Sequence, residues 1–190
     1  MDKVKKFFKS CFYSYAWLAI VLLIVDQLTK LWALKAAWDL TLIPNFLHLT
    51  YVRNTGAAWS IFDGNMTLLA VVSAVVGVAI IVARILYRHK LNAFKKILFA
   101  VILAGTWGNF IDRAFSKLVT GEEGVIDFIH FQFGRYHFPV FNVADICITL
   151  GILTYLVYLF REEYVMMKKT KGAKQTNAEI KEEDDASNTN

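Results

Sequence analysis

The apolar residues of the chain are grouped into four long stretches that carry almost no charge. The only charged side chain within them is Asp145, and the first stretch continues past Asp26 to residue 34. These stretches are residues 11–25, 64–83, 97–111 and 136–160. A helix needs about 20 mainly apolar residues to cross a bilayer core of about 30 Å. We therefore predict four transmembrane helices, at about residues 11–34, 64–84, 95–113 and 140–161.

The connections between these helices differ in pattern. Residues 36–63 contain the β-branched and aromatic run "LHLTYV", and turn signals at Pro44-Asn45 and at Asn54 to Gly56 flank it, so we predict a small β-structure there. The second such connection, residues 114–139, mixes glycine, polar and aromatic residues, and we expect a loop with rings at headgroup depth. The fold class is a polytopic α-helical membrane protein with a small β-structure outside the membrane.

Composition and charge agree with a membrane class. Hydrophobic residues make up 56% of the 190 residues, against roughly 45–50% in soluble domains. Lys and Arg are concentrated before the first helix, between the second and third helices, and after the fourth. The positive-inside rule then places both termini in the cytoplasm, with the first helix as an uncleaved anchor. Topology and attraction to membrane lipid explain the net charge of +5, so we expect no nucleic-acid partner.

The end of the chain has a different composition. Residues 168–190 contain almost no large apolar side chain, so burial cannot offset the entropy of ordering them. We predict a single membrane domain over residues 1–167, followed by a disordered cytoplasmic tail.

Polar residues that hydrocarbon tolerates poorly fall into one layer toward the predicted outer face. They come from the first, third and fourth predicted helices and from both outer connections. They are Asp26, Gln27, Lys30, Asn54, Asn109, Asp112, Arg113, Asp127, Asn142 and Asp145. Their shared depth predicts that they meet inside the bundle.

Each of these residues also has a simpler explanation. Asn142 and Asp145 have the spacing of an N-cap with an acidic partner at the start of a helix. Asp112 and its neighbour Arg113 could form a surface pair, and Asp26 with Lys30 could be a local ion pair one turn apart. These alternatives stay open from the sequence alone.

Asp127 and Asp145 suggest a reaction when they are considered together. Two carboxylates in a partly dry site cannot both ionise easily, so they share one proton. One can then act as base toward a water while the other donates a proton, as in aspartic proteases. The sequence has no HExxH or GxSxG motif, and the four histidines lack metal-ligand spacing, so we expect no metal and no cofactor.

Five motifs in order resemble lipoprotein signal peptidase, also called signal peptidase II. They are "DQLTK" at 26–30, "NTGAAW" at 54–59, "GNFIDR" at 108–113, "VIDF" at 125–128 and "FNVAD" at 141–145. The resemblance implies an aspartic endopeptidase of the bacterial cell membrane that cuts prolipoproteins just before a diacylglyceryl-modified cysteine. It also implies a β-cradle and a loop helix over the site, which faces outward, and sensitivity to globomycin-type inhibitors.

The resemblance assigns roles by matching position. Asp127 and Asp145 are the expected catalytic pair. The expected substrate-binding residues are Asn54, Gly56, Asn109, Arg113 and Asn142. The expected supporting residues are Asp26, Lys30, Gly108, Asp112 and Ala144. Prolipoprotein and membrane lipid are the expected partners, and we expect a monomer.

Two departures and one alternative accompany the resemblance. Trp59 stands where the family motif leads us to expect Phe, and the segment 114–126 is longer than expected, so the covering loop is predicted to be larger. The alternative function is a small proton-coupled transporter or membrane binding protein. That function favours polar residues spread across the membrane depth rather than gathered at one face.

Overall fold

Four long helices dominate the computed structural model, which describes residues 14–56 and 62–187, with residues 173–187 described by their backbone alone. The helices are α2 (Ala16–Ala36), α3 (Met66–Leu86), α4 (Ala93–Thr120) and α5 (Val143–Ser187). Each is long and apolar enough to cross a membrane, with the span in α5 covering Val143–Gly172. The prediction of four transmembrane helices is confirmed. Residues 11–13 of the first predicted helix lie outside the described residues.

Helix α4 extends further than its apolar run. Its N-cap is Asn92, whose side chain accepts a hydrogen bond from the Lys95 N–H at 2.8 Å, and its C-cap is Gly121, where φ is +80°. No helix breaker interrupts the polar and apolar residues between Arg113 and Gly121, so the helix continues to Thr120 rather than stopping near residue 113.

The strands form one antiparallel sheet. They are β1 (Asp39–Ile43), β2 (Leu47–Asn54), β3 (Val125–Phe133) and β4 (Tyr136–His137), in the order β1-β2-β3-β4. The turn between β1 and β2 contains Asn45 at φ +59°, a conformation that asparagine tolerates well. The predicted β-structure in the first outer connection is therefore confirmed.

The structure corrects the prediction made for the second outer connection. Residues 125–133 are a strand, not a loop, and they pair with β2, which places Asp127 opposite Val52. Phe128 is only 4% exposed and packs edge-on against Trp38, so it belongs to the core, whereas Phe133 is exposed. The run "VIDFIHFQF" is rich in β-branched and aromatic residues, which suit a strand in the middle of a sheet.

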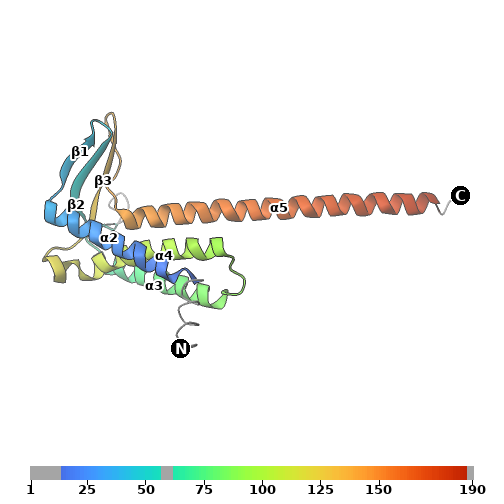
Figure 1. Cartoon of the computed structure of the whole chain (residues 1–190), viewed down its shortest axis with the longest axis horizontal. Helices are drawn as coiled ribbons and strands as arrows, with labels where there is room; N and C mark the ends of the chain where they lie inside the picture. Colours follow the sequence, from blue (N-terminus) through green and yellow to red (C-terminus); the bar gives the residue numbers. More distant parts are fainter. Residues whose placement is uncertain (1–13, 57–61, 188–190) are drawn as a thin grey trace, which may run out of the picture. The chain divides into compact units, whose positions relative to one another are not determined.

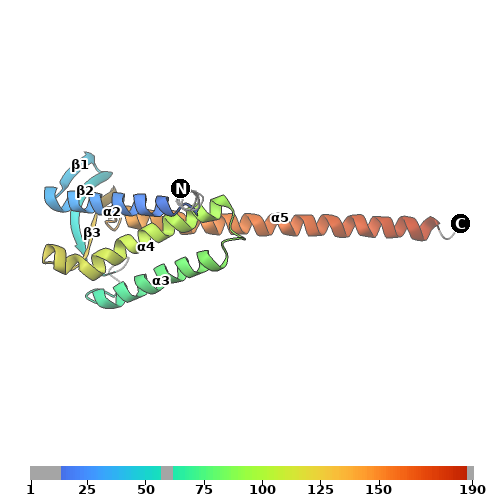
Figure 2. The same ribbon diagram turned by 60° about the horizontal axis from the view of Figure 1, so that its bottom comes forward.

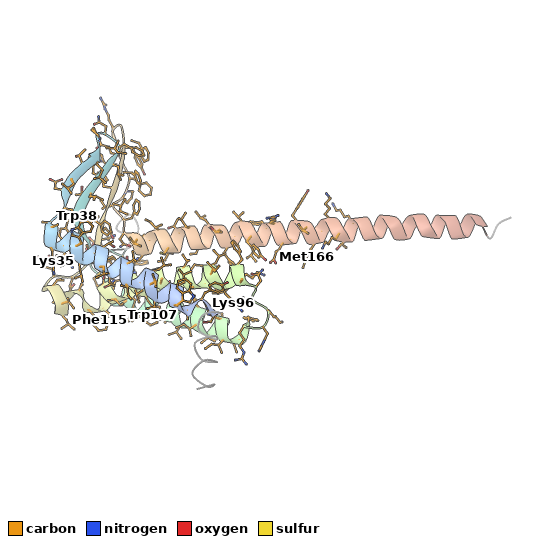
Figure 3. All side chains as sticks on the ribbon, viewed as in Figure 1. Lys35, Trp38, Lys96, Trp107, Phe115 and Met166 are labelled. Carbon is orange, nitrogen blue, oxygen red and sulfur yellow. The ribbon has the colours of Figure 1, made fainter. Side chains whose placement is uncertain are left out.

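Helix α4 lies between α2 and α3, and the sheet stands at one end of these helices (Figures 1 and 2). A small core of Ala33, Trp38, Ile126 and Phe128 joins the end of α2 to β3. Lys96 lies at the opposite end of the helices from Trp38 (Figure 3). The β-structure and the basic connection between α3 and α4 are therefore at opposite ends.

Two further predictions concern the outer loop and the tail. A separate loop helix over the site is not among the described residues; residues 57–61, including Trp59, lie outside them. Helix α5 runs through residues 168–187, where we predicted disorder. These residues are rich in Ala, Glu and Lys, which favour helix.

Candidate active site

Asp127 projects from β3 into a buried polar layer. Its side chain is held by two amides: Asn142 Nδ2 donates to Oδ1 at 2.6 Å, and Asn54 Nδ2 donates to Oδ2 at 2.9 Å. The residue is only 2% exposed. Gly56 contributes indirectly, because its N–H donates to Asn54 Oδ1 at 3.0 Å and fixes the orientation of that amide. Both carboxylate oxygens of Asp127 therefore have defined partners.

Asp145 occupies the first turn of α5. Its Oδ1 accepts from Asn109 Nδ2 at 2.7 Å, and its Oδ2 accepts from the Asn142 backbone N–H at 3.1 Å. The Asp145 N–H in turn donates to Asn142 Oδ1 at 3.0 Å, which completes a reciprocal capping box. The predicted N-cap is confirmed, and the same residues also belong to the polar layer.

Asn142 connects the two carboxylates. It is fully buried, and its Nδ2 donates both to Asp127 and to Asn109 Oδ1, the latter at 3.2 Å. Burial, and the nearby charge of Asp145, raise the pKa of Asp127 to about 7, although the two amide hydrogen bonds oppose this shift. Near neutral pH, Asp127 therefore takes up a proton far more readily than an ordinary aspartate does.

A second buried cluster adjoins the pair. Lys30 Nζ lies 2.9 Å from Asp26 Oδ2 and 2.8 Å from Asp112 Oδ2, and both Asp26 and Lys30 are 1% exposed. An exposed local pair between Asp26 and Lys30 is therefore ruled out. The Asp112 side chain turns to Lys30, so a surface pair with its neighbour Arg113 is not what closes α4.

Lys30 links this cluster to the aspartate pair. Its Nζ donates to Asn109 Oδ1 at 3.2 Å, the same oxygen that accepts from Asn142. Asn109 can present its Nδ2 to Asp145 only in this orientation, because its oxygen is held by Lys30. The lysine therefore fixes an amide that contacts the pair.

Gly108 and Ala144, two of the supporting residues that the resemblance assigned, contact this cluster through their backbones. Asp26 Oδ1 accepts from the Ala144 N–H at 2.8 Å, which ties α2 to the start of α5. A Cβ at Gly108 would lie 2.5 Å from Asp26 Oδ2, so the absence of a side chain there makes room for the carboxylate. Gln27 was placed in the predicted polar layer without an assigned role, and its Nε2 donates to Gly108 O at 3.3 Å and to Asp112 Oδ1 at 3.2 Å.

Arg113, a predicted substrate-binding residue, makes its side-chain hydrogen bond away from the pair. Its Nη1 donates to Ser73 Oγ on α3 at 2.9 Å, while its Nε is buried without a hydrogen-bond partner. Its charge nevertheless interacts with those of Asp127 and Asp145. Ser73 was missed by sequence reasoning; its only signal is that it is polar within the most apolar helix.

Three of the four histidines lie side by side on the sheet, an arrangement that their spacing in the sequence did not indicate. His48 pairs with His130 across β2 and β3, and His130 Nε2 lies 3.2 Å from His137 Nδ1. Burial and the two neighbouring histidines lower the pKa of His130. Within the described ranges, no three His, Cys, Asp or Glu residues are arranged to hold a metal ion.

These features define the class of the protein. It is a polytopic membrane protein in which a β-strand and a helix start bring two carboxylates together at one end of the helices, the buried Asp127 and the partly buried Asp145. Two neighbouring carboxyl groups, one protonated and one ionised, can activate a water and protonate a departing group.

Comparison with known proteins identifies the family. The model of the family described as Signal peptidase (SPase) II matches residues 18–161. A lipoprotein signal peptidase of Clostridium acetobutylicum is 41% identical over 140 residues, covering 72% of this chain and 87% of that protein. One of Listeria monocytogenes serotype 4b is 37% identical over 168 residues, covering 84% and 99%. This chain belongs to the signal peptidase II family.

Solved structures agree with this assignment. One described as a bacterial membrane enzyme structure at 2.3 Å resolution superposes with a TM-score of 0.63 and is 33% identical, covering 76% of this chain and 85% of that one. The family and the four spans together make the chain a peptidase of a bacterial membrane.

Proposed function

We propose that this chain is an aspartic endopeptidase that cleaves diacylglyceryl-modified prolipoproteins just before the lipidated cysteine. The observation that carries the proposal is the pair of Asp127 and Asp145, joined through the buried Asn142. The relatives' name, lipoprotein signal peptidase, supports the substrate class. No metal or cofactor enters the mechanism.

The reaction uses the one proton that the pair holds. Asp145 takes a proton from a water, which attacks the scissile carbonyl, while protonated Asp127 donates to the carbonyl oxygen. Collapse of the tetrahedral intermediate breaks the C–N bond, and the amine leaves with the proton that Asp145 had accepted. Asp127 recovers its proton from the hydroxyl that becomes the new carboxyl group. No covalent intermediate forms.

The remaining polar residues divide into two roles in this proposal. Asn54, Asn109 and Asn142 orient the carboxylates, to which their amides already donate. Arg113 binds substrate, because its buried Nε has a donor without a partner and its planar fork suits a backbone carbonyl. Globomycin-type inhibitors would occupy the same site.

The site faces the outside of the cell in this proposal, and both termini are cytoplasmic. The sheet is at the same end of the helices as Trp38, and the basic connection that contains Lys96 is at the other end (Figure 3). The positive-inside rule assigns the basic end to the cytoplasm. A lipid-anchored substrate then presents its scissile bond at the depth of the pair.

The first prediction tests the substrate class. Purified protein in lipid should cleave a diacylglyceryl-modified prolipoprotein at least about tenfold faster than the same precursor without the lipid, because acyl chains buried at about 0.8 kcal/mol per CH₂ supply binding. The measurement is the initial rate of peptide release from each precursor. Equal rates would contradict a role for the lipid in recognition.

The second prediction concerns pH. Because burial and Asp145 raise the pKa of Asp127 to about 7, the pair holds its proton below that value and loses it above. We expect kcat/KM to fall as pH rises through about 7. The charged groups that act on Asp127 are Asp145, Lys30 and Arg113. A rate that stays constant to about pH 9 would show that the reaction does not need this proton.

A further inference from the structure

Arg53, the residue before Asn54 on β2, connects the sheet to the end of α4. Its Nη2 donates to Thr120 Oγ1 at 2.7 Å, and its Nη1 donates to the backbone oxygens of Gly124 at 3.2 Å and Glu122 at 3.5 Å. The side chain is only 13% exposed. One guanidinium therefore binds three acceptors on the connection between α4 and β3.

Two further contacts fix the guanidinium itself. Its Nε donates to Tyr51 Oη at 2.6 Å, and the same nitrogen lies 3.6 Å from Glu122 Oε2. The fork is thus held on β2 by Tyr51 while it holds the chain beyond α4. A planar group with several fixed donors is suited to this arrangement, and an ammonium is not.

The segment Thr120–Gly124, which we call the α4–β3 joint, is also closed from within. The Gly124 N–H donates to Ser116 Oγ at 3.2 Å, and Thr120 Oγ1 donates to Ser116 O at 2.8 Å. Gly124 has φ +128°, and a Cβ there would lie 3.3 Å from Arg53 Cβ. The joint therefore packs directly on Arg53 just before β3 begins.

We infer that Arg53 is a positioning residue of the aspartate pair: by holding the α4–β3 joint, it sets β2 against β3 so that Asn54 meets Asp127. The β2–β3 ladder shifts register between Leu49 and Val52, so the pairs beyond that irregularity form a short separate segment. In this segment Arg53 pairs with Ile126, directly beside the Asn54–Asp127 hydrogen bond. The catalytic consequence rests on the proposed function.

The action of Arg53 on Asp127 passes through Asn54. The groups that influence Asp127 are Asp145, Lys30, Arg113 and the amides of Asn54 and Asn142. The Asn54 hydrogen bond lowers the pKa of Asp127, so weakening it should raise that pKa. A displaced joint would therefore move the alkaline limb of the pH profile to higher pH, which a loss of general stability would not do.

The test compares Arg53→Lys with wild type in lipid, using diacylglyceryl-modified prolipoprotein as substrate. The lysine keeps the positive charge but loses the fork, so we expect kcat to fall about tenfold or more with KM within about twofold, and the alkaline limb to shift upward. Asn54→Ala should shift the limb in the same direction, and adding Arg53→Lys to it should produce no further shift. Lys117→Met is the matched control, because it removes an exposed cation that contacts Glu123 of the same joint; its kcat should not change.

The outcomes separate the two proposals. Normal kcat in Arg53→Lys, or a lowered kcat with an unmoved alkaline limb, would overturn the positioning role while cleavage by wild type left the proposed function intact. If Arg53→Lys does not fold, Thr120→Val removes one acceptor and keeps the arginine, and it should shift the limb in the same direction; an unmoved limb there would overturn the inference. An inactive wild type would overturn the proposed function and this inference with it.

Discussion

Replacing Asp127 by Asn is expected to reduce cleavage by at least about 10² to 10⁴-fold, the usual contribution of a positioned acid or base. The amide is close in size to the carboxyl group but cannot exchange the catalytic proton. Its oxygen can still accept from Asn142 or Asn54, so the protein should remain folded. The measurement is kcat/KM for release of the signal peptide in lipid. Asp145→Asn should show a loss of the same order, because each carboxylate needs the other.

The matched control for these variants is Asp39→Asn. Asp39 lies on the exposed strand β1, so the substitution removes the same charge from the same end of the molecule without touching the polar layer. Its activity should equal that of wild type. Full activity in Asp127→Asn or Asp145→Asn would exclude the two-carboxylate mechanism.

Replacing Lys30 by Met is expected to lower the free energy of unfolding by about 3–5 kcal/mol. The lysine is buried between Asp26 and Asp112, so its removal leaves two buried carboxylates without their counter-charge. The loss would be measured by thermal or denaturant unfolding in detergent. Activity should also fall, because Asn109 loses the donor that fixes its oxygen.

Lys35→Met is the control for that substitution. Lys35 is exposed in the last turn of the same helix, so its replacement should change the free energy of unfolding by less than about 0.5 kcal/mol. Adding Asp26→Asn and Asp112→Asn to Lys30→Met should restore part of the lost stability, since the buried charge is then removed. An unchanged stability in Lys30→Met alone would contradict the buried-cluster account.

The four membrane spans and most of the polar layer could be predicted from the sequence, because both depend on the bilayer. Hydrocarbon requires long apolar helices, and it makes each polar group at depth stand out. The pairing of Asn142 with Asp145 was also predictable, because a capping box depends only on residues three apart.

Features that depend on which distant segment packs against a residue could not be predicted from local patterns. Residues 125–133 contain rings that suit a headgroup layer as well as a strand, and only pairing with β2 decides between them. The hydrogen bond from Arg113 to Ser73 required the packing of α3 on α4, and the three adjacent histidines required the sheet register. Long-range pairing of this kind leaves no local pattern in one sequence.

The most direct test of the central claim is the mass of the peptide released from a diacylglyceryl-modified prolipoprotein. The purified protein in lipid should release a signal peptide that ends at the residue before the lipidated cysteine, and the Asp39→Asn variant should release the same peptide. Asp127→Asn and Asp145→Asn should release none within the same time. Release of that peptide by either of these two variants at the wild-type rate, or cleavage by wild type at another bond, would contradict the account.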